Sequence, residues 1–314
     1  MSRIAVTGVS GYLGTLVLRK LEKREDVECI VGIDWKPPMY RPPKLEFARR
    51  DIRDPFGDVL VQHKVDRAMH LAFAVRPGHD DGAARRINID GARNFLRACE
   101  EASVKGVLYL SSHTAYGPHP DNAIPLTETS PLRPIPSFQY SWDKAEADRM
   151  FQAFGQDHPG RCVTVVRACS ILGPNGAGSV STGMFKSVMI RISGYDPLVQ
   201  FLHEDDLAEL LVMLILRGHR GVFNAGGSGP LRYREIIAGT GKPCIALPAG
   251  VLSVLLDATW RLRLQSESPP GGLEFIKHPL VMSTRKVEEE TGFRFRFTTR
   301  DALLSYLGAP RRKI

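Results

Sequence analysis

The sequence lacks the cysteine patterns that indicate a disulfide framework or a thiolate metal site. Its 314 residues include only five cysteines, and they are scattered without a CxxC pair. An odd, unpatterned set of cysteines is typical of proteins in a reducing compartment. We therefore predict a cytoplasmic protein without structural disulfides.

Long apolar runs are also missing. The longest, residues 210–216, is far too short to cross a bilayer. The first predicted strand starts at the third residue, so we expect no signal peptide. We predict no membrane span.

A clustered basic face is absent as well. The formal charge is +8, but the lysines and arginines are spread along the chain. A nucleic-acid partner would favour a basic stripe or arm. With 43% hydrophobic and 24% charged residues, the chain is expected to build a packed core. We predict a small-molecule partner and no nucleic acid.

The first informative feature that is present is a glycine-rich stretch at residues 7–14. The apolar residues 4–6 lead directly into Gly8, Gly11 and Gly14, and apolar residues at helical spacing follow. This pattern predicts a buried strand, a tight turn and a helix. The helix N-terminus would offer backbone N–H groups to a pyrophosphate. A glycine triplet alone can also serve packing, so a second signal is needed.

The second signal is Asp34. It ends a second apolar strand, residues 27–33, about twenty residues beyond Gly14. An acidic residue at this separation is the expected partner of a ribose 2′-hydroxyl. Its charge would repel a 2′-phosphate. The two features together predict a dinucleotide site that prefers NAD over NADP.

Strands and helices continue to alternate after Asp34. The sequence predicts further strands at 45–48, 65–74, 106–110 and 162–168, with helices at 56–63 and 80–103 and another with Ser137 as N-cap. This rhythm predicts an α/β fold with a Rossmann-type doubly wound parallel sheet, whose ligands bind beyond the carboxyl ends of the strands.

Beyond about residue 173 the alternation decays. Helices are predicted at 205–216, 232–238, 251–264 and 298–307, with one strand at 222–224. We therefore predict an NAD-binding domain with the catalytic residues at 1–173. A smaller α/β substrate lobe at 174–314 would be interleaved with the end of the sheet.

Tyr140 and Lys144 form the strongest chemical pair. Positions i and i+4 share one face of a helix, so the phenol and the ammonium are expected to be neighbours. A nearby cation favours the phenolate and lowers the pKa of a tyrosine, which suits a general base. A single tyrosine and lysine at this spacing can occur by chance. Here the spacing follows a glycine turn and a strand that ends in Ser111 and Ser112, which favours a functional pair.

On these motifs the chain resembles an extended short-chain dehydrogenase/reductase of the NAD-dependent epimerase/dehydratase family, over nearly its whole length. The matching stretches are 7–14, Asp34, 51–52, 70–74, Asn88, 111–117, 140–144, 167–174 and 203–206.

The resemblance implies a role for each matching residue. Ser112 would hydrogen-bond the substrate oxygen, Tyr140 would be the acid/base, and Lys144 would hold the nicotinamide ribose. Asn88 would support the site from its helix. The implied NAD contacts are Gly8, Gly11, Tyr12, Leu13, Gly14, Asp34, Asp51, Ile52, Leu71, Ala72, Phe73, Tyr140 and Lys144. The implied function is NAD-dependent hydride transfer at a secondary alcohol or ketone, and the implied assembly is a homodimer.

Departures from the family pattern bear on the substrate. Family dehydratases carry an acidic residue after the catalytic Ser/Thr, where this chain has His113, so dehydration is not expected. A nucleotide-sugar 4-epimerase stays an alternative. Its asparagine after the sixth strand, however, falls at Ser170, and its diphosphate-binding arginine falls at Val199. Arg191 or Arg76 could replace that arginine. The candidate substrate residues are Asn88, His113, Ser170 and Arg191.

Three further hypotheses concern segments outside these motifs. The apolar stretch 251–264 either forms the core of the smaller lobe or shapes a pocket for an apolar alcohol or ketone. Residues 173–178 lack the Gly-Lys-Ser/Thr of a P-loop and are predicted to form a mobile substrate loop. His119, Asp121 and Glu128 lack metal-ligand spacing, so no metal is predicted.

A non-catalytic dinucleotide-sensing module is the remaining alternative to an enzyme. The intact set of Ser112, Tyr140 and Lys144 argues against it.

Overall fold

The apolar runs predicted as strands lie side by side in one parallel sheet. The computed structural model describes residues 1–75, 78–176 and 187–308. Within them a seven-stranded sheet has the order β11-β6-β5-β4-β1-β2-β3, and every pairing is parallel. The strands are β1 Ser2–Thr7, β2 Val27–Asp34, β3 Leu45–Arg49, β4 Arg67–His70, β5 Gly106–Ser112, β6 Cys162–Ala168 and β11 Gly221–Ala225.

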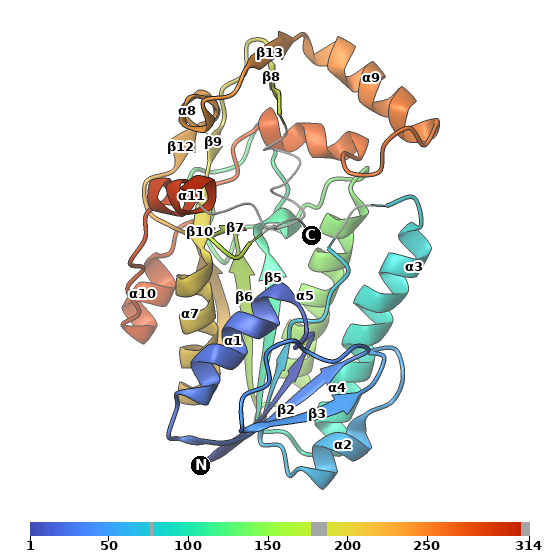
Figure 1. Cartoon of the computed structure of the whole chain (residues 1–314), viewed down its shortest axis with the longest axis vertical. Helices are drawn as coiled ribbons and strands as arrows, with labels where there is room; N and C mark the ends of the chain where they lie inside the picture. Colours follow the sequence, from blue (N-terminus) through green and yellow to red (C-terminus); the bar gives the residue numbers. More distant parts are fainter. Residues whose placement is uncertain (76–77, 177–186, 309–314) are drawn as a thin grey trace.

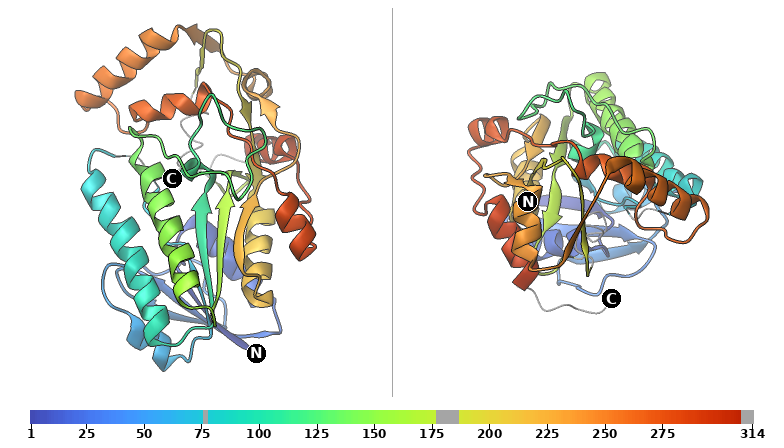
Figure 2. Two further views of the ribbon diagram at one scale, coloured as in Figure 1. Left: turned by 180° about the vertical axis from the view of Figure 1, so that it is seen from behind. Right: turned by 90° about the horizontal axis from the view of Figure 1, so that it is seen from above.

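Helices cover both faces of this sheet (Figures 1 and 2). On one face, α1 Tyr12–Glu22 and α7 Glu204–Arg217 pack with the sheet in one hydrophobic core. On the other, α2 Gly57–Gln62, α4 Gly91–Glu101 and α5 Gln139–Asp157 build a second core. A short helix α3 Asp81–Arg85 and a π-helical turn Arg86–Asp90 precede α4. The Rossmann-type α/β class is confirmed.

A smaller lobe lies over the carboxyl ends of the strands (Figure 1). Its described residues form three short two-stranded sheets. Their pairs are β7 Ser170–Leu172 with β10 Phe201–His203, β8 Met189–Ile192 with β13 Cys244–Leu247, and β9 Leu198–Val199 with β12 Leu231–Arg232. Its helices are α8 Tyr233–Thr240, α9 Ala249–Arg261, a 3₁₀ segment Pro270–Ile276, α10 Arg285–Thr291 and α11 Thr299–Gly308.

The chain crosses between the two parts more than once. After the first segment of the lobe it returns to the sheet, where α7 covers one face and β11 pairs with β6. These two elements follow residue 173 in sequence and still belong to the sheet in space. The division of the chain into units 1–173 and 174–314 stays a prediction.

Several element ends shift by a few residues from those predicted, and three elements differ more clearly. Helix α5 begins at Gln139 with Phe138 at its N-cap, because Ser137 precedes the turn and makes no cap. Strand β4 ends at His70 instead of running to residue 74, since the Asn88 side chain accepts a hydrogen bond from Ala74 N at 2.7 Å. The helix predicted at 80–103 is interrupted by the π-helical turn.

Helix α9 has one apolar side that packs inward and one that is exposed. Leu252 is buried and, with Leu256, belongs to a small hydrophobic cluster of the lobe. Both residues also line a cavity, whereas Val254 is 71% exposed and Leu255 is 50% exposed. In the described ranges no helix combines the length and the apolar character that a bilayer crossing needs.

Candidate functional site

A cavity of about 240 Å³ lies at the carboxyl ends of β1, β4 and β5. It is lined at one end by the glycine turn and at the other by Ser112, Tyr140 and Lys144. The lining residues predicted to bind cofactor are Gly8, Gly11, Tyr12, Leu13, Gly14, Leu71 and Phe73. Segments far apart in sequence therefore meet in one space.

The glycine turn is packed too tightly for side chains at two of its positions. Gly8 has a φ of +72°, and an added Cβ would lie 2.7 Å from Ala72 N. A Cβ at Gly14 would lie 2.3 Å from the carbonyl oxygen of Gly8. Such distances are below van der Waals contact, so β1, α1 and the residues after β4 can approach only through glycine.

Gly11 has a different surrounding. It is the N-cap of α1 and provides no capping side chain, and the first turn of the helix holds no acidic residue. A Cβ there would approach only the Gly8 carbonyl, at 3.2 Å. The amino end of α1 thus presents backbone N–H groups and the positive end of the helix dipole to the cavity, as a pyrophosphate requires.

Asp34 lies beside this turn at the end of β2. Its carboxylate accepts hydrogen bonds from Ser10 N at 3.0 Å and from Lys36 N at 3.4 Å. Asp51 pairs with Arg53, and Ile52 is buried against Gly91. Neither Asp51 nor Ile52 is among the described residues that line the cavity.

Ser112, Tyr140 and Lys144 converge because β5 ends where α5 begins its second turn. Ser112 is the last residue of β5, and the two others lie on successive turns of α5. The Lys144 ammonium donates to Leu110 O at 2.7 Å and lies 3.6 Å from the centre of the Phe73 ring. It is 5.9 Å from the centre of the Tyr140 ring.

The protonation of this pair differs from the prediction. Burial raises the pKa of Tyr140 to about 12, although a hydrogen bond with the Ser112 side chain acts in the opposite direction. Burial also lowers the pKa of Lys144 to about 7, against the pull of Asp148 and Asp143. Lys144 does not lower the pKa of Tyr140 as expected, because its ammonium is directed at Leu110 O and the Phe73 ring.

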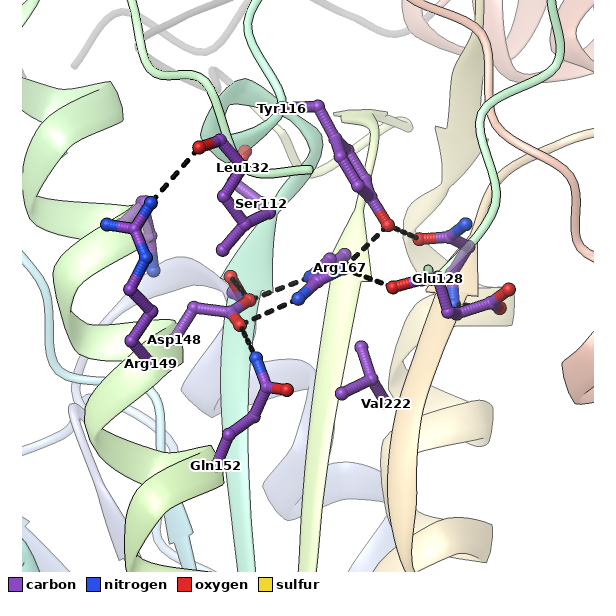
Figure 3. A network of polar contacts seen from close by, with 12 residues as sticks. Ser112, Tyr116, Glu128, Leu132, Asp148, Arg149, Gln152, Arg167 and Val222 are labelled. Carbon is purple, nitrogen blue, oxygen red and sulfur yellow. Dashed lines mark hydrogen bonds and ion pairs between the residues drawn. The ribbon is translucent and has the colours of Figure 1, made fainter. Parts of the chain in front are cut away.

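A buried ion pair lies behind the segment that ends in Ser112 (Figure 3). Arg167 on β6 makes two hydrogen bonds of 2.9 Å to Asp148 on α5, and both side chains are almost fully buried. Arg167 also donates to the Tyr116 hydroxyl at 2.8 Å, and Ser111 donates to Asp148 at 2.6 Å. The network joins β5, β6 and α5 directly beneath Ser112 and Tyr140.

Asn88 acts behind the cavity and does not line it. Its amide donates to Asp143 at 2.9 Å, while its carbonyl oxygen accepts from Ala74 N. This arrangement fixes the segment that carries Leu71, Ala72 and Phe73. Asn88 faces a separate hollow of about 250 Å³.

The remaining candidate substrate residues divide into two groups. His113 and Ser170 line both the first cavity and a second one of about 300 Å³. Arg191 lines neither of them, because it lies on the exposed side of β8 and faces a hollow formed with Asp196 and Arg234. Its prediction as a substrate contact is therefore not supported. Arg76 and the end of the predicted loop 173–178 lie outside the described residues.

One cluster beside the cavity was not predicted. The Tyr12 hydroxyl contacts the buried carboxylate of Glu204, which also accepts from Asn175 N at 3.1 Å. These contacts join the glycine turn to the smaller lobe. Glu204 enters the sequence prediction only as part of the matching stretch 203–206. That stretch does not predict a contact between Glu204 and Tyr12.

The chain matches a family model described as NAD dependent epimerase/dehydratase family over residues 4–226. A Mycobacterium tuberculosis protein described as uncharacterized is 28% identical over 312 residues, which cover 96% of this chain and 82% of the relative. A protein named UDP-glucose 4-epimerase from Lactobacillus helveticus is 28% identical over 184 residues, 57% of this chain and 54% of the relative.

Two solved structures show the same fold. The UDP-glucose 4-epimerase of Thermotoga maritima has a TM-score of 0.76 at 18% identity and covers 97% of both chains. The dTDP-glucose 4,6-dehydratase DesIV of Streptomyces venezuelae has a TM-score of 0.74 at 21% identity, over 97% of this chain and 95% of its own.

Proposed function

The chain belongs to the NAD-dependent epimerase/dehydratase family, and from this premise we propose that it transfers a hydride between NAD and the carbon of a secondary alcohol or ketone. Tyr140 is the acid/base in this proposal. One observation carries it: a single cavity is lined both by the glycine turn and by Ser112, Tyr140 and Lys144.

The residues present fit the cofactor that the family uses. The amino end of α1 at Gly11 would hold the pyrophosphate, and Asp34 would accept the ribose 2′-hydroxyl. Leu71 and Phe73 would line the path to the reactive end, beside Lys144. When bound, NAD supplies the acceptor or donor of the hydride, and the protein orients the reactants and moves the proton.

The proton passes through Tyr140. In the oxidative direction Tyr140 in its ionised, phenolate form would accept the proton of the substrate hydroxyl as the C=O bond forms. Bound NAD would supply the acceptor for the hydride that leaves the carbinol carbon. Ser112, which lines the same cavity as Tyr140, would stabilise the substrate oxygen as its charge changes. The reductive direction is the reverse, and the protonated phenol then supplies the proton.

The test compares Tyr140→Phe with Tyr40→Phe. Tyr40 contacts Glu22 on the outer side of α1, away from the cavity. We expect Tyr140→Phe to lower kcat by about 10²–10⁴-fold, the contribution of a positioned acid/base. Tyr40→Phe should keep wild-type activity. Equal kcat values of the two variants would refute the role of Tyr140 as the acid/base.

A nucleotide-sugar 4-epimerase is the second candidate, favoured by relatives with that name. An epimerase oxidises and then reduces the same carbon, so it accumulates no NADH and tends to retain its NAD. Tight NAD that survives gel filtration, with no net NADH, would support it. Free cofactor exchange, with NADH formed from an alcohol, would support the dehydrogenase.

Dehydration is not part of the proposal. His113, which follows Ser112, is a poor proton donor because burial lowers its pKa to about 3. The Thr114 hydroxyl is bonded to Ser112 at 3.0 Å. The homodimer and the cytoplasmic location stay predictions.

A further inference from the structure

The second cavity, of about 300 Å³, begins where the catalytic cavity ends. The two share His113 and Ser170 as common walls. The other walls are mostly aliphatic and aromatic side chains from β8, β9, α9 and the 3₁₀ segment, among them Leu198, Leu273 and Phe275. The second cavity is therefore a space that the remaining atoms of a molecule bound at Ser112 and Tyr140 can enter.

The described residues around the second cavity do not suit a phosphate. Among those that line it there is no lysine and no arginine. His113 is buried and neutral at physiological pH, since burial lowers its pKa to about 3. Glu267, which also lines the cavity, is an exposed carboxylate and adds no positive charge. Proteins bind phosphates through charge-assisted hydrogen bonds from arginine or lysine, and desolvating a diphosphate without them is costly.

Three arginines that flank lining residues of this cavity, Arg191, Arg232 and Arg234, lie or bond away from it. Val199, which stands where the resemblance places a diphosphate-binding arginine, lines the apolar wall. Arg191 faces the hollow on the other side of β8. Arg232 donates to Asp196 O, and Arg234 pairs with the Asp196 carboxylate at 3.2 Å.

We propose that the second cavity holds the uncharged, largely apolar body of the alcohol or ketone substrate, and that the substrate is not a nucleotide diphosphate sugar. This inference rests on the proposed hydride transfer, because the shared wall at His113 and Ser170 connects the cavity to Ser112 and Tyr140. A volume of about 300 Å³ is at the lower end of the range for small-molecule sites. The substrate class is therefore a medium-sized aliphatic or alicyclic secondary alcohol.

A binding experiment tests the cavity independently of catalysis. Leu256 and Leu255 are neighbours on α9, but only Leu256 is among the described lining residues, and Leu255 is half-exposed. Leu256→Arg places a charge in the cavity, whereas Leu255→Arg makes the same change on the surface. The probe is Nile red, an uncharged apolar dye whose fluorescence rises on binding.

We expect wild type and Leu255→Arg to bind the dye with similar affinity and Leu256→Arg to bind it at least about tenfold more weakly. A long-chain 2-alkanol should displace the dye, and UDP-glucose should not. Val199→Arg is the second variant in case Leu256→Arg fails to fold, which thermal melting detects. Equal binding by both leucine variants, no binding by wild type, or displacement by UDP-glucose would each overturn the inference.

A kinetic experiment separates this inference from the proposed function. NADH formation is measured with 2-alkanols of increasing length, and UDP-glucose and UDP-galactose are assayed in parallel. Each added methylene should raise kcat/KM by about fourfold until the cavity is filled. Dye displacement by alkanols without any turnover would refute the proposed hydride transfer and keep the cavity assignment. Turnover of a UDP-sugar in preference to every alkanol would refute the cavity assignment and keep the hydride transfer.

Discussion

Replacing Gly8 by alanine should damage both the stability of the protein and its cofactor site. The Gly8 backbone has a φ of +72°, and its missing Cβ would lie 2.7–2.9 Å from three backbone atoms of Leu71 and Ala72. None of these atoms belongs to a flexible side chain, so β1 and the segment after β4 must separate to admit a methyl group. The same segment carries the cavity residues Leu71 and Phe73.

A matched control, Gly292→Ala, separates the two contributions to the destabilisation expected for Gly8→Ala. Gly292 ends α10 with the same φ of +72°, but an added Cβ there has no described neighbour within 4 Å. Gly292→Ala therefore carries only the left-handed backbone cost, about 1–2 kcal/mol. Gly8→Ala carries that cost plus about 1–3 kcal/mol for the forced backbone shift. We expect about 2–5 kcal/mol of destabilisation for Gly8→Ala in total.

Urea unfolding of the cofactor-free protein measures both variants on one scale. NAD should raise the Tm of wild type and Gly292→Ala but not that of Gly8→Ala, because only the last change disturbs the glycine turn. If Gly8→Ala were no less stable than Gly292→Ala, the close approach between the two segments would not be present in the molecule.

Three shorter predictions follow from the site. Arg167→Met should lower the free energy of unfolding by about 3–5 kcal/mol, because it leaves the Asp148 carboxylate buried without its partner; a loss below about 1 kcal/mol in chemical denaturation would contradict this. Ultraviolet difference titration of cofactor-free wild type against Tyr140→Phe should show a phenol that ionises above pH 10, since burial raises its pKa to about 12. A titration midpoint below pH 10 would mean that Lys144 lowers the pKa of Tyr140 after all. Asp34→Ser should weaken NAD binding by about 10–100-fold, because a charged hydrogen bond is lost. The same change should allow NADP to bind, because the negative charge that repels its 2′-phosphate is removed. Calorimetry measures both affinities, and equal affinity of the wild type for the two cofactors would refute the role of Asp34.

The regular part of the fold was predictable from the sequence because its signals are local. The strand, turn and helix around Gly8 follow from adjacent residues, and so does the pairing of Tyr140 with Lys144 on one helical face. The element types of the sheet domain are therefore those predicted, with changes mainly at the boundaries.

The parts that escaped prediction depend on contacts between distant residues. No sequence signal near Asp148 predicts its pairing with Arg167. The ion pair forms because β6 lies beside β5 under α5. The protonation of Tyr140 and Lys144 was mispredicted for the same reason. Spacing placed the two groups on one face, but the surrounding burial, which sequence does not report, outweighs their mutual effect.

The late return of β11 to the sheet has a consequence during synthesis on the ribosome. Strand β6 is complete at residue 168, but its partner β11 spans Gly221–Ala225. At roughly 5–20 residues per second, the valine-rich β6 waits several seconds with one edge of hydrogen-bonding groups unpaired. Such an edge is a template for pairing between nascent chains. The interleaved order that brings the smaller lobe over the carboxyl ends of the strands thus raises the risk of aggregation during synthesis. A chain that stops before residue 225 would retain that exposed edge permanently.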